Sequence, residues 1–227
     1  KIEFDSFADI FAGTGIVANH FHDRSKIIVN DILDSNAHIY AAFFGKGKMR
    51  EEKLKERLKY YNDIKIKEYD ENYFSKNFSN TYFDAENSKK IGLIRDDIEK
   101  LFEKEIITKR EKSYLLTSLI YALDKIANTV GHYDAYRKID IPNKKLFLLP
   151  LDITNSPYSA EIYKDDANKL VKKIKADVVY IDPPYNSRQY SDAYHLLENI
   201  TTWKKEKVFG VAKKIDRSHI KSKYNMK

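Results

Sequence analysis

The chain has 227 residues and no cysteine, so a disulfide framework and a thiolate metal site are both excluded. Its 41 Lys and Arg residues outnumber 34 Asp and Glu residues, giving a net charge of +7 and a pI near 9.1. This balance favours polyanionic partners such as nucleic acid, although lysine-rich composition also reflects AT-rich genomes. No apolar run approaches the roughly 20 residues that span a bilayer, and the start is not a signal peptide. We therefore expect a cytoplasmic protein that does not bind membranes.

The first 44 residues predict alternating strands and helices. An apolar strand over residues 4–11 leads into the turn Ala12-Gly13-Thr14-Gly15 and then into a helix over 16–21. A second strand over 26–31 ends in an acid, and a helix with an Asp or Ser cap follows. This order of elements predicts an α/β fold with a parallel sheet.

Residues 45–137 differ in character, because they form long charged segments with helical periodicity. The clearest helix is expected over 111–130, where apolar residues recur at spacings of three and four. Lysines, arginines and tyrosines alternate over 46–69, a pattern that suits contacts with DNA but also an ordinary solvated helix face. We predict that 45–137 is an inserted, mainly helical target-recognition region.

Strand and helix signals return after residue 138. We expect a strand over 146–149, a helix over 159–174, a strand that ends at Asp182 and a helix over 190–203. Residues 1–44 and 138–227 would then form the catalytic domain. Because the chain begins at the first strand and stops about 40 residues after Tyr185, we expect this domain to be incomplete at both ends.

The glycine turn indicates a ligand with a ribose. Gly13 and Gly15 let a ligand approach the backbone, since neither carries a Cβ atom. Asp31 follows 16 residues after Gly15, at the end of the next strand, where such folds bind ribose hydroxyls. The third glycine of the dinucleotide pattern is replaced by Ala18. The turn therefore favours a nucleoside-bearing cofactor, with a purely structural turn as the alternative.

The sequence Asp182-Pro183-Pro184-Tyr185 is the most specific motif in the chain. The two prolines stiffen the turn, so that the carboxylate of Asp182 and the carbonyl of Pro183 form a fixed pair of acceptors. Tyr185 adds a ring that can stack on a base. Such acceptors bind both hydrogens of an exocyclic amine and localise its lone pair as a new bond forms. A structural turn with a surface tyrosine is the alternative.

Together, the segments Asp9-Ile10-Phe11-Ala12-Gly13-Thr14-Gly15 and Asp182-Pro183-Pro184-Tyr185 resemble those of Dam-like adenine-N6 DNA methyltransferases. The residues that follow, from Asn186 to Glu198, are similar to the extended motif of the restriction–modification type. The resemblance implies a Rossmann-like sheet that binds S-adenosyl-L-methionine, and methyl transfer to the N6 amine of adenine in a specific sequence of double-stranded DNA. It also implies base flipping and a cognate restriction endonuclease as a partner.

The resemblance and the basic segments assign roles to individual residues. Cofactor binding is expected at Asp9, Phe11, Gly13, Gly15, Asp31, Ile32, Asp152 and Ile153. The target amine and its ring are expected at Asp182, Pro183 and Tyr185. DNA contacts are expected at Arg188, His132, Tyr133, Lys213 and Arg217. No metal is expected, because the six histidines show no ligand spacing.

Three other functions remain open at this stage. Methylation of cytosine N4 is one, because this amine resembles the N6 amine of adenine. An aspartate at the head of the motif favours adenine by what is usual in the family and not by a physical argument. Amino methylation of RNA or of a protein glutamine uses related chemistry. A DNA-binding module that has lost turnover is also compatible with a chain that looks trimmed, although the intact Asp182 argues against it.

Overall fold

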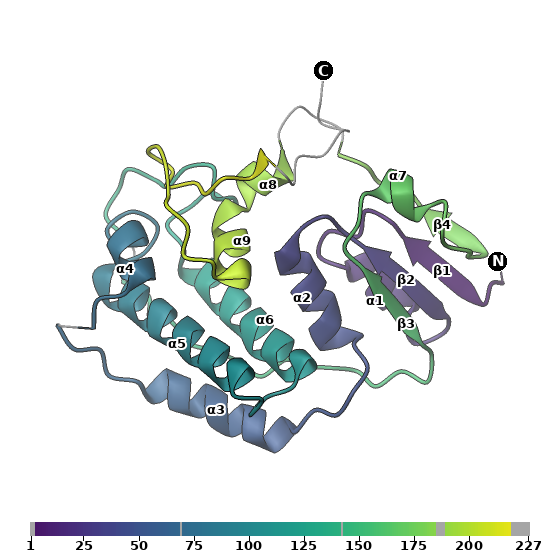
Figure 1. Cartoon of the computed structure of the whole chain (residues 1–227), viewed down its shortest axis with the longest axis horizontal. Helices are drawn as coiled ribbons and strands as arrows, with labels where there is room; N and C mark the ends of the chain where they lie inside the picture. The colour runs from purple at the N-terminus through teal and green to yellow at the C-terminus, as the bar shows by residue number, and fades with distance from the viewer. Residues whose placement is uncertain (1–2, 69, 142, 185–188, 219–227) are drawn as a thin grey trace.

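The computed structural model describes residues 3–68, 70–141, 143–184 and 189–218. A parallel sheet lies at one end of the molecule and a layer of helices at the other (Figure 1). The strands of the sheet are β1 (Ser6–Asp9), β2 (Lys26–Asn30), β3 (Ala160–Tyr163) and β4 (Val178–Tyr180), in the order β3-β2-β1-β4. This arrangement confirms the predicted α/β, Rossmann-like fold class.

The sheet has a topological switch point beside its first strand. β1 pairs with β2 on one side and with β4 on the other, and all three pairings are parallel. In open α/β sheets, ligands bind where the strand order reverses, at the carboxyl ends of the strands. Because Asp9 pairs with Tyr180, the glycine turn and the Asp182 motif leave the sheet at the same edge. The fold therefore brings together two motifs that are far apart in the sequence.

Nine helices are formed by the described residues. They are α1 (Ile16–Phe21), α2 (Asp34–Phe43), α3 (Glu51–Asp63), α4 (Tyr73–Phe78), α5 (Ala85–Glu103), α6 (Lys109–Ile126), α7 (Ala167–Leu170), α8 (Tyr190–Ala193) and α9 (His195–Thr202). The helix expected over 111–130 is α6, which ends at Ile126 before the expected stop at Gly131. The helix expected over 190–203 is divided at Tyr194 into α8 and α9.

The strand expected over 146–149 is absent from the described structure, and this expectation was wrong. Leu146 and Leu148 are buried in the helical layer. Their backbone N–H groups donate to side-chain oxygens of Asn87 and Asn62, at 2.9 and 2.8 Å. Asparagine side chains thus replace the neighbouring strand, so a run of leucines that resembles a strand passes through a helical core.

The helix expected over 159–174 was also wrong, because most of this region is extended or irregular. Its first part is strand β3, whose residues Ala160 to Tyr163 pair in parallel with Ile27 to Asn30 of β2. Only the four residues of α7 are helical further on, and Asp166 caps that helix by accepting a hydrogen bond from the Asn168 N–H at 2.8 Å. Pairing with a strand more than 130 residues away decided the conformation.

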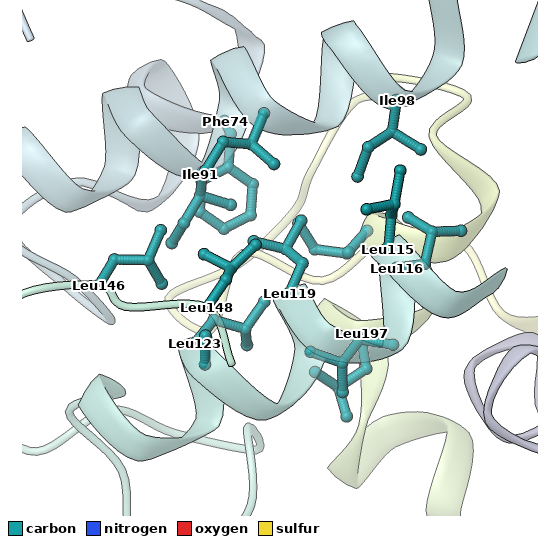
Figure 2. Close-up of a cluster of buried hydrophobic side chains, with 14 of the residues drawn as sticks. Phe74, Ile91, Ile98, Leu115, Leu116, Leu119, Leu123, Leu146, Leu148 and Leu197 are labelled. Atoms are coloured by element: carbon teal, nitrogen blue, oxygen red, sulfur yellow. The ribbon is translucent and has the colours of Figure 1, made fainter. Parts of the chain in front are cut away.

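The main hydrophobic core lies in the helical layer, between α5, α6, α9 and the extended segment at 146–148. Figure 2 shows part of this core, with Ile91 and Ile98 of α5 and Leu197 of α9 facing the leucines of α6. The core therefore takes residues from both sides of the expected boundary at 137 and 138, and the division into two domains stays a prediction. None of the helices in the described part of the chain is long and apolar enough to cross a bilayer.

A buried carboxylate joins α3 to α6. Glu111 is 1% exposed, and it accepts hydrogen bonds from the Arg50 side chain, from the Arg50 N–H at 2.9 Å and from the Thr108 N–H at 2.8 Å. The Arg50 side chain lowers the pKa of Glu111 to about 2. Because the pKa is lowered from 4.5, the pair stabilises the fold above pH 4.5 and loses that effect as the pH falls towards 2.

Glu111→Ala is expected to lower the free energy of unfolding at pH 7 by about 2–3 kcal/mol, because Arg50 loses its partner and the cap of α6 is lost. Urea denaturation at pH 7 and at pH 3 measures this loss, and the difference from wild type should shrink at pH 3. Glu52→Ala is the control, because the Glu52–Lys55 ion pair is exposed and should contribute little. Equal stability of both variants at pH 7 would contradict this role for Glu111.

Candidate active site

A cavity of about 530 Å³ opens at the switch point between β1 and β4. Its volume lies within the range usual for small-molecule sites. Several residues expected at the site line it together: Asp9, Phe11, Gly13, Asp31, Ile32 and Asp182. The glycine turn and the Asp182 motif therefore face one cavity, as the proposed chemistry requires.

The turn after β1 requires glycine at two positions. Gly13 and Gly15 have φ angles of +52° and +78°, in the left-handed region that other residues rarely adopt. A Cβ atom on Gly15 would also lie 3.0 Å from the Tyr40 ring. The Tyr40 hydroxyl donates to the carbonyl of Gly13 at 2.5 Å, which holds the turn against α2. Gly15 thus shapes the turn from behind, while Gly13 faces the cavity.

Asp31 ties the glycine turn to the start of α2. Its carboxylate accepts hydrogen bonds from the Gly13 N–H at 3.0 Å and from the Leu33 N–H at 2.9 Å. Burial raises the pKa of Asp31, although these N–H groups oppose the shift. Asp31 is thus a buried carboxylate that neighbouring N–H groups hold in place at the wall of the cavity.

Asp9 is a buried acid at the wall of the cavity, with an exposed fraction of 1%. Burial raises its pKa to about 6, and the nearby charges of Asp31 and Asp182 add to the shift. The Phe11 N–H opposes the shift. Asp9, Asp31 and Asp182 are among six aspartates that line the cavity, and their negative charge favours a ligand that carries positive charge.

The second motif reaches the cavity through Asp182 and Pro184. Asp182 is exposed two residues beyond the end of β4, and Pro183 beside it is half-buried. Tyr185 and Arg188 lie outside the described residues. The described part of the motif therefore presents a carboxylate at the carboxyl edge of the sheet, on the same cavity as Asp9 and Asp31.

The structure does not bring Asp152 and Ile153 to this cavity. Asp152 lines a second cavity of about 220 Å³ beside α6, and Ile153 packs against the helical core. Asp165 and Asp166, which follow β3, line the first cavity instead. Asp152 and Ile153 were assigned from the family resemblance, and the segment before them does not form the strand expected over 146–149. The alternating pattern of 160–163 followed by two acids was the signal that the sequence offered.

Helices α6 and α8 contribute to the wall of the cavity, although no sequence signal had given them a role there. Tyr121 and Asp124 come from α6, inside the expected insertion, while Tyr190 and Tyr194 come from α8 and its end. The helical region thus completes the wall that faces Asp182. No spacing rule predicts this contact, because α6 and β4 are separated by about fifty residues of chain.

Several residues that were expected to contact DNA are engaged within the protein. Tyr133 is completely buried, and its hydroxyl donates to Asp124 at 2.9 Å, which corrects the expectation that it touches DNA. Arg217 donates to Asp192 at 2.7 Å, so its guanidinium is committed to an ion pair rather than to a phosphate. His132 and Lys213 are half-buried.

The basic stretch at 46–69 is also engaged within the protein. Arg50 pairs with Glu111, and Arg57 lies 3.4 Å from Asp97 and over the Tyr60 ring. Figure 1 places α3 at the outer edge of the helical layer, on the side away from α8. This position favours a solvated, salt-bridged helix face over a DNA clamp. Among the described residues, no group of three or more His, Asp or Glu side chains is arranged to hold a metal ion.

Comparisons with known proteins identify the family. The family model of the D12 class N6 adenine-specific DNA methyltransferases matches residues 3–227. The chain is 36% identical over 233 residues to the modification methylase StsI of Streptococcus sanguinis, which covers 97% of this chain and 36% of that protein. It is 34% identical to the type II methyltransferase M.FokI of Planomicrobium okeanokoites, over 90% of this chain and 34% of that protein.

A third relative is the type II methyltransferase M.NlaIII of Neisseria lactamica, which is 33% identical over 87% of this chain and 60% of its own length. The chain thus spans about a third of the length of the first two relatives. No solved structure is significantly similar. On the match of its whole described length and on the shared cavity of its two motifs, the chain belongs to the D12 class N6 adenine-specific DNA methyltransferase family.

Proposed function

We propose that the protein transfers a methyl group from S-adenosyl-L-methionine to the N6 amine of adenine within a specific sequence of double-stranded DNA. One observation carries the proposal: the carboxylate of Asp182 and the acids of the glycine-turn region line a single cavity at the switch point of the sheet. A donor held at the turn after β1 would lie next to an amine held at the end of β4.

The residues around the turn fit this cofactor. The buried carboxylates of Asp9 and Asp31 suit a ligand with positive charges and ribose hydroxyls. Apart from the Phe11 N–H, neither oxygen of Asp9 has a hydrogen-bond donor among the described residues, so the acid is prepared for a donor from outside. When bound, S-adenosyl-L-methionine supplies an electrophilic methyl group on a positively charged sulfur.

The residues after β4 would hold the amine. Asp182 and the carbonyl of Pro183 accept its two hydrogens, and the lone pair then points towards the electrophile. Tyr185 is proposed to stack on the base. The base must leave the duplex to reach Asp182, at a cost of a few kcal/mol in lost pairing and stacking.

Two further parts of the proposal come from the relatives. Their names describe modification methylases and type II methyltransferases, which are the methylating half of restriction–modification systems. We therefore propose a cognate restriction endonuclease that acts on the same DNA sequence. The family itself is adenine-specific, so methylation at cytosine N4 and an inactive binding module are both disfavoured.

Sequencing that detects modified bases tests the function directly. DNA from cells that express the full gene is expected to carry N6-methyladenine at one short sequence, and DNA from cells with an empty vector is expected to carry none there. The experiment identifies the base and the sequence in one step. Methylation only at cytosine N4, or no modified base at all, would refute the proposal.

A further inference from the structure

We propose that Tyr190 and Tyr194 form an aromatic platform that receives the flipped adenine. The inference rests on the proposed function, because it concerns the second wall of the same target pocket. Both rings line the cavity that contains Asp182. They come from the segment after the Asp182 motif, for which the sequence predicted a helix and a likeness to the extended motif but no contact with the base.

The geometry of the two rings suits a planar ligand. Their planes are inclined by only 14° and their centroids lie 6.2 Å apart, one helical turn from each other. Tyr190 is 42% exposed and borders the cavity, so part of its surface is left without a protein neighbour. Stacking on a base would bury that surface and replace the contacts that the base loses on leaving the duplex.

The helix that carries the rings is anchored on its opposite side. Ser191 and Ala193 are buried, and the carbonyl of Ala193 accepts a hydrogen bond from the Tyr133 N–H at 2.6 Å. Asp192 is held by the ion pair with Arg217. Figure 1 shows α8 at the end of the helical layer that faces α7 and the sheet. The rings thus project from a fixed support, which reduces the entropy lost on binding.

The hydroxyl groups also complement the chemistry of adenine. Asp182 in its ionised form and the Pro183 carbonyl can only accept hydrogen bonds, which satisfies the two hydrogens of the amine. The ring nitrogens of adenine are acceptors and need donors. A tyrosine hydroxyl is a donor, so the tyrosine that does not stack on the base can supply the donor that Asp182 and the Pro183 carbonyl do not.

Tyr190→Ala is expected to lower kcat/KM for a duplex with the recognised sequence by about 10- to 100-fold, the value of one base–aromatic stack. Tyr190→Phe keeps the ring and should remain within about fivefold of wild type, a loss that corresponds to one hydrogen bond. Tyr158→Ala is the matched control, because Tyr158 is 44% exposed and lies away from the cavity. It should leave kcat/KM unchanged. Thermal melting and cofactor affinity are measured for each variant.

A second substrate separates stacking from damage to the fold. In a duplex whose target adenine faces an abasic site, flipping costs no pairing and only stacking is lost. The flipped state is then more populated within the complex, so the defect of Tyr190→Ala in kcat should be smaller than on the paired duplex. Tyr190→Leu, which keeps volume without the aromatic face, should behave like Tyr190→Ala. An equal defect on both duplexes, or activity of Tyr190→Ala within twofold of wild type, would overturn the platform. Absence of methyl transfer by the wild-type protein would instead refute the proposed function.

Discussion

Asp182→Ala is expected to lower the rate of methyl transfer to DNA by about 10²- to 10³-fold, the usual cost of removing one preorganised polar group from a transition state. The reason is local, because the alanine variant leaves the target amine with one acceptor instead of two. Transfer of labelled methyl groups from S-adenosyl-L-methionine to DNA measures the rate. Asp182→Asn should lie between the two proteins, since the amide keeps one acceptor oxygen but loses the charge.

Cofactor affinity separates a catalytic role of Asp182 from a structural one. Asp182 is exposed and follows β4, while the turn and the acids expected to hold the cofactor belong to β1 and β2. Both Asp182 variants should therefore bind the cofactor within a few-fold of wild type. Methyl transfer by Asp182→Ala at the wild-type rate would end the proposed mechanism.

Asp9→Asn is expected to weaken cofactor binding by about 10- to 100-fold, because a hydrogen bond to a charged group typically contributes about 1.5–3 kcal/mol. Titration calorimetry with S-adenosyl-L-methionine measures the dissociation constant. Asp152→Asn is the matched control, since the structure places Asp152 on a different cavity. A loss of affinity in Asp152→Asn comparable to that in Asp9→Asn would contradict the placement of the cofactor at the glycine turn.

The raised pKa of Asp9 predicts that the affinity for the cofactor depends on pH. Because the pKa of Asp9 is raised to about 6, its charge is lost as the pH falls through 6, and cofactor affinity should fall by up to about tenfold per pH unit below that value. In Asp9→Asn this dependence should flatten. A dissociation constant that stays constant between pH 5 and pH 7 in the wild-type protein would show that the charge of Asp9 is not needed.

Asp9→Asn should stabilise the ligand-free protein at neutral pH, although it weakens cofactor binding. A raised pKa means that the folded protein binds this proton more tightly than the unfolded chain, so Asp9 lowers stability as the pH rises from 3.8 to about 6. Asp9→Asn removes that penalty and should raise the Tm of the ligand-free protein at pH 7. Weaker cofactor binding together with a higher Tm cannot result from partial unfolding, whereas a lower Tm would contradict the buried charge.

Local patterns in the sequence predicted a large part of the fold. The strands at β1 and β2, the glycine turn between β1 and α1, and the helix α6 follow from hydrophobic periodicity and glycine placement. The parallel sheet followed from the alternation of strands and helices. The strand predicted at 146–149 does not form, because its leucines are buried by helices and its backbone is paired with asparagine side chains.

The motifs of the candidate site could be predicted from the sequence, but the helices that line the rest of the cavity could not. Asp9, Asp31 and Asp182 could be found because each ends or closely follows an apolar strand at the ligand-binding edge of a parallel sheet. Tyr133 looked like a surface residue in a polar loop, yet its ring is buried and its hydroxyl bonds to Asp124. Whether a polar aromatic residue faces solvent depends on packing, which a local pattern does not report.

The sequence by itself determined the family, the fold class and the chemistry of the two motifs, because these depend on residues close together in the chain. Only the tertiary structure decided that β3 rather than 146–149 completes the sheet, and that Tyr121 and Tyr190 border the pocket of Asp182. These features arise from contacts between segments separated by tens to more than a hundred residues. Such contacts depend on how the apolar faces of whole helices and strands pack together, and no short sequence pattern encodes them.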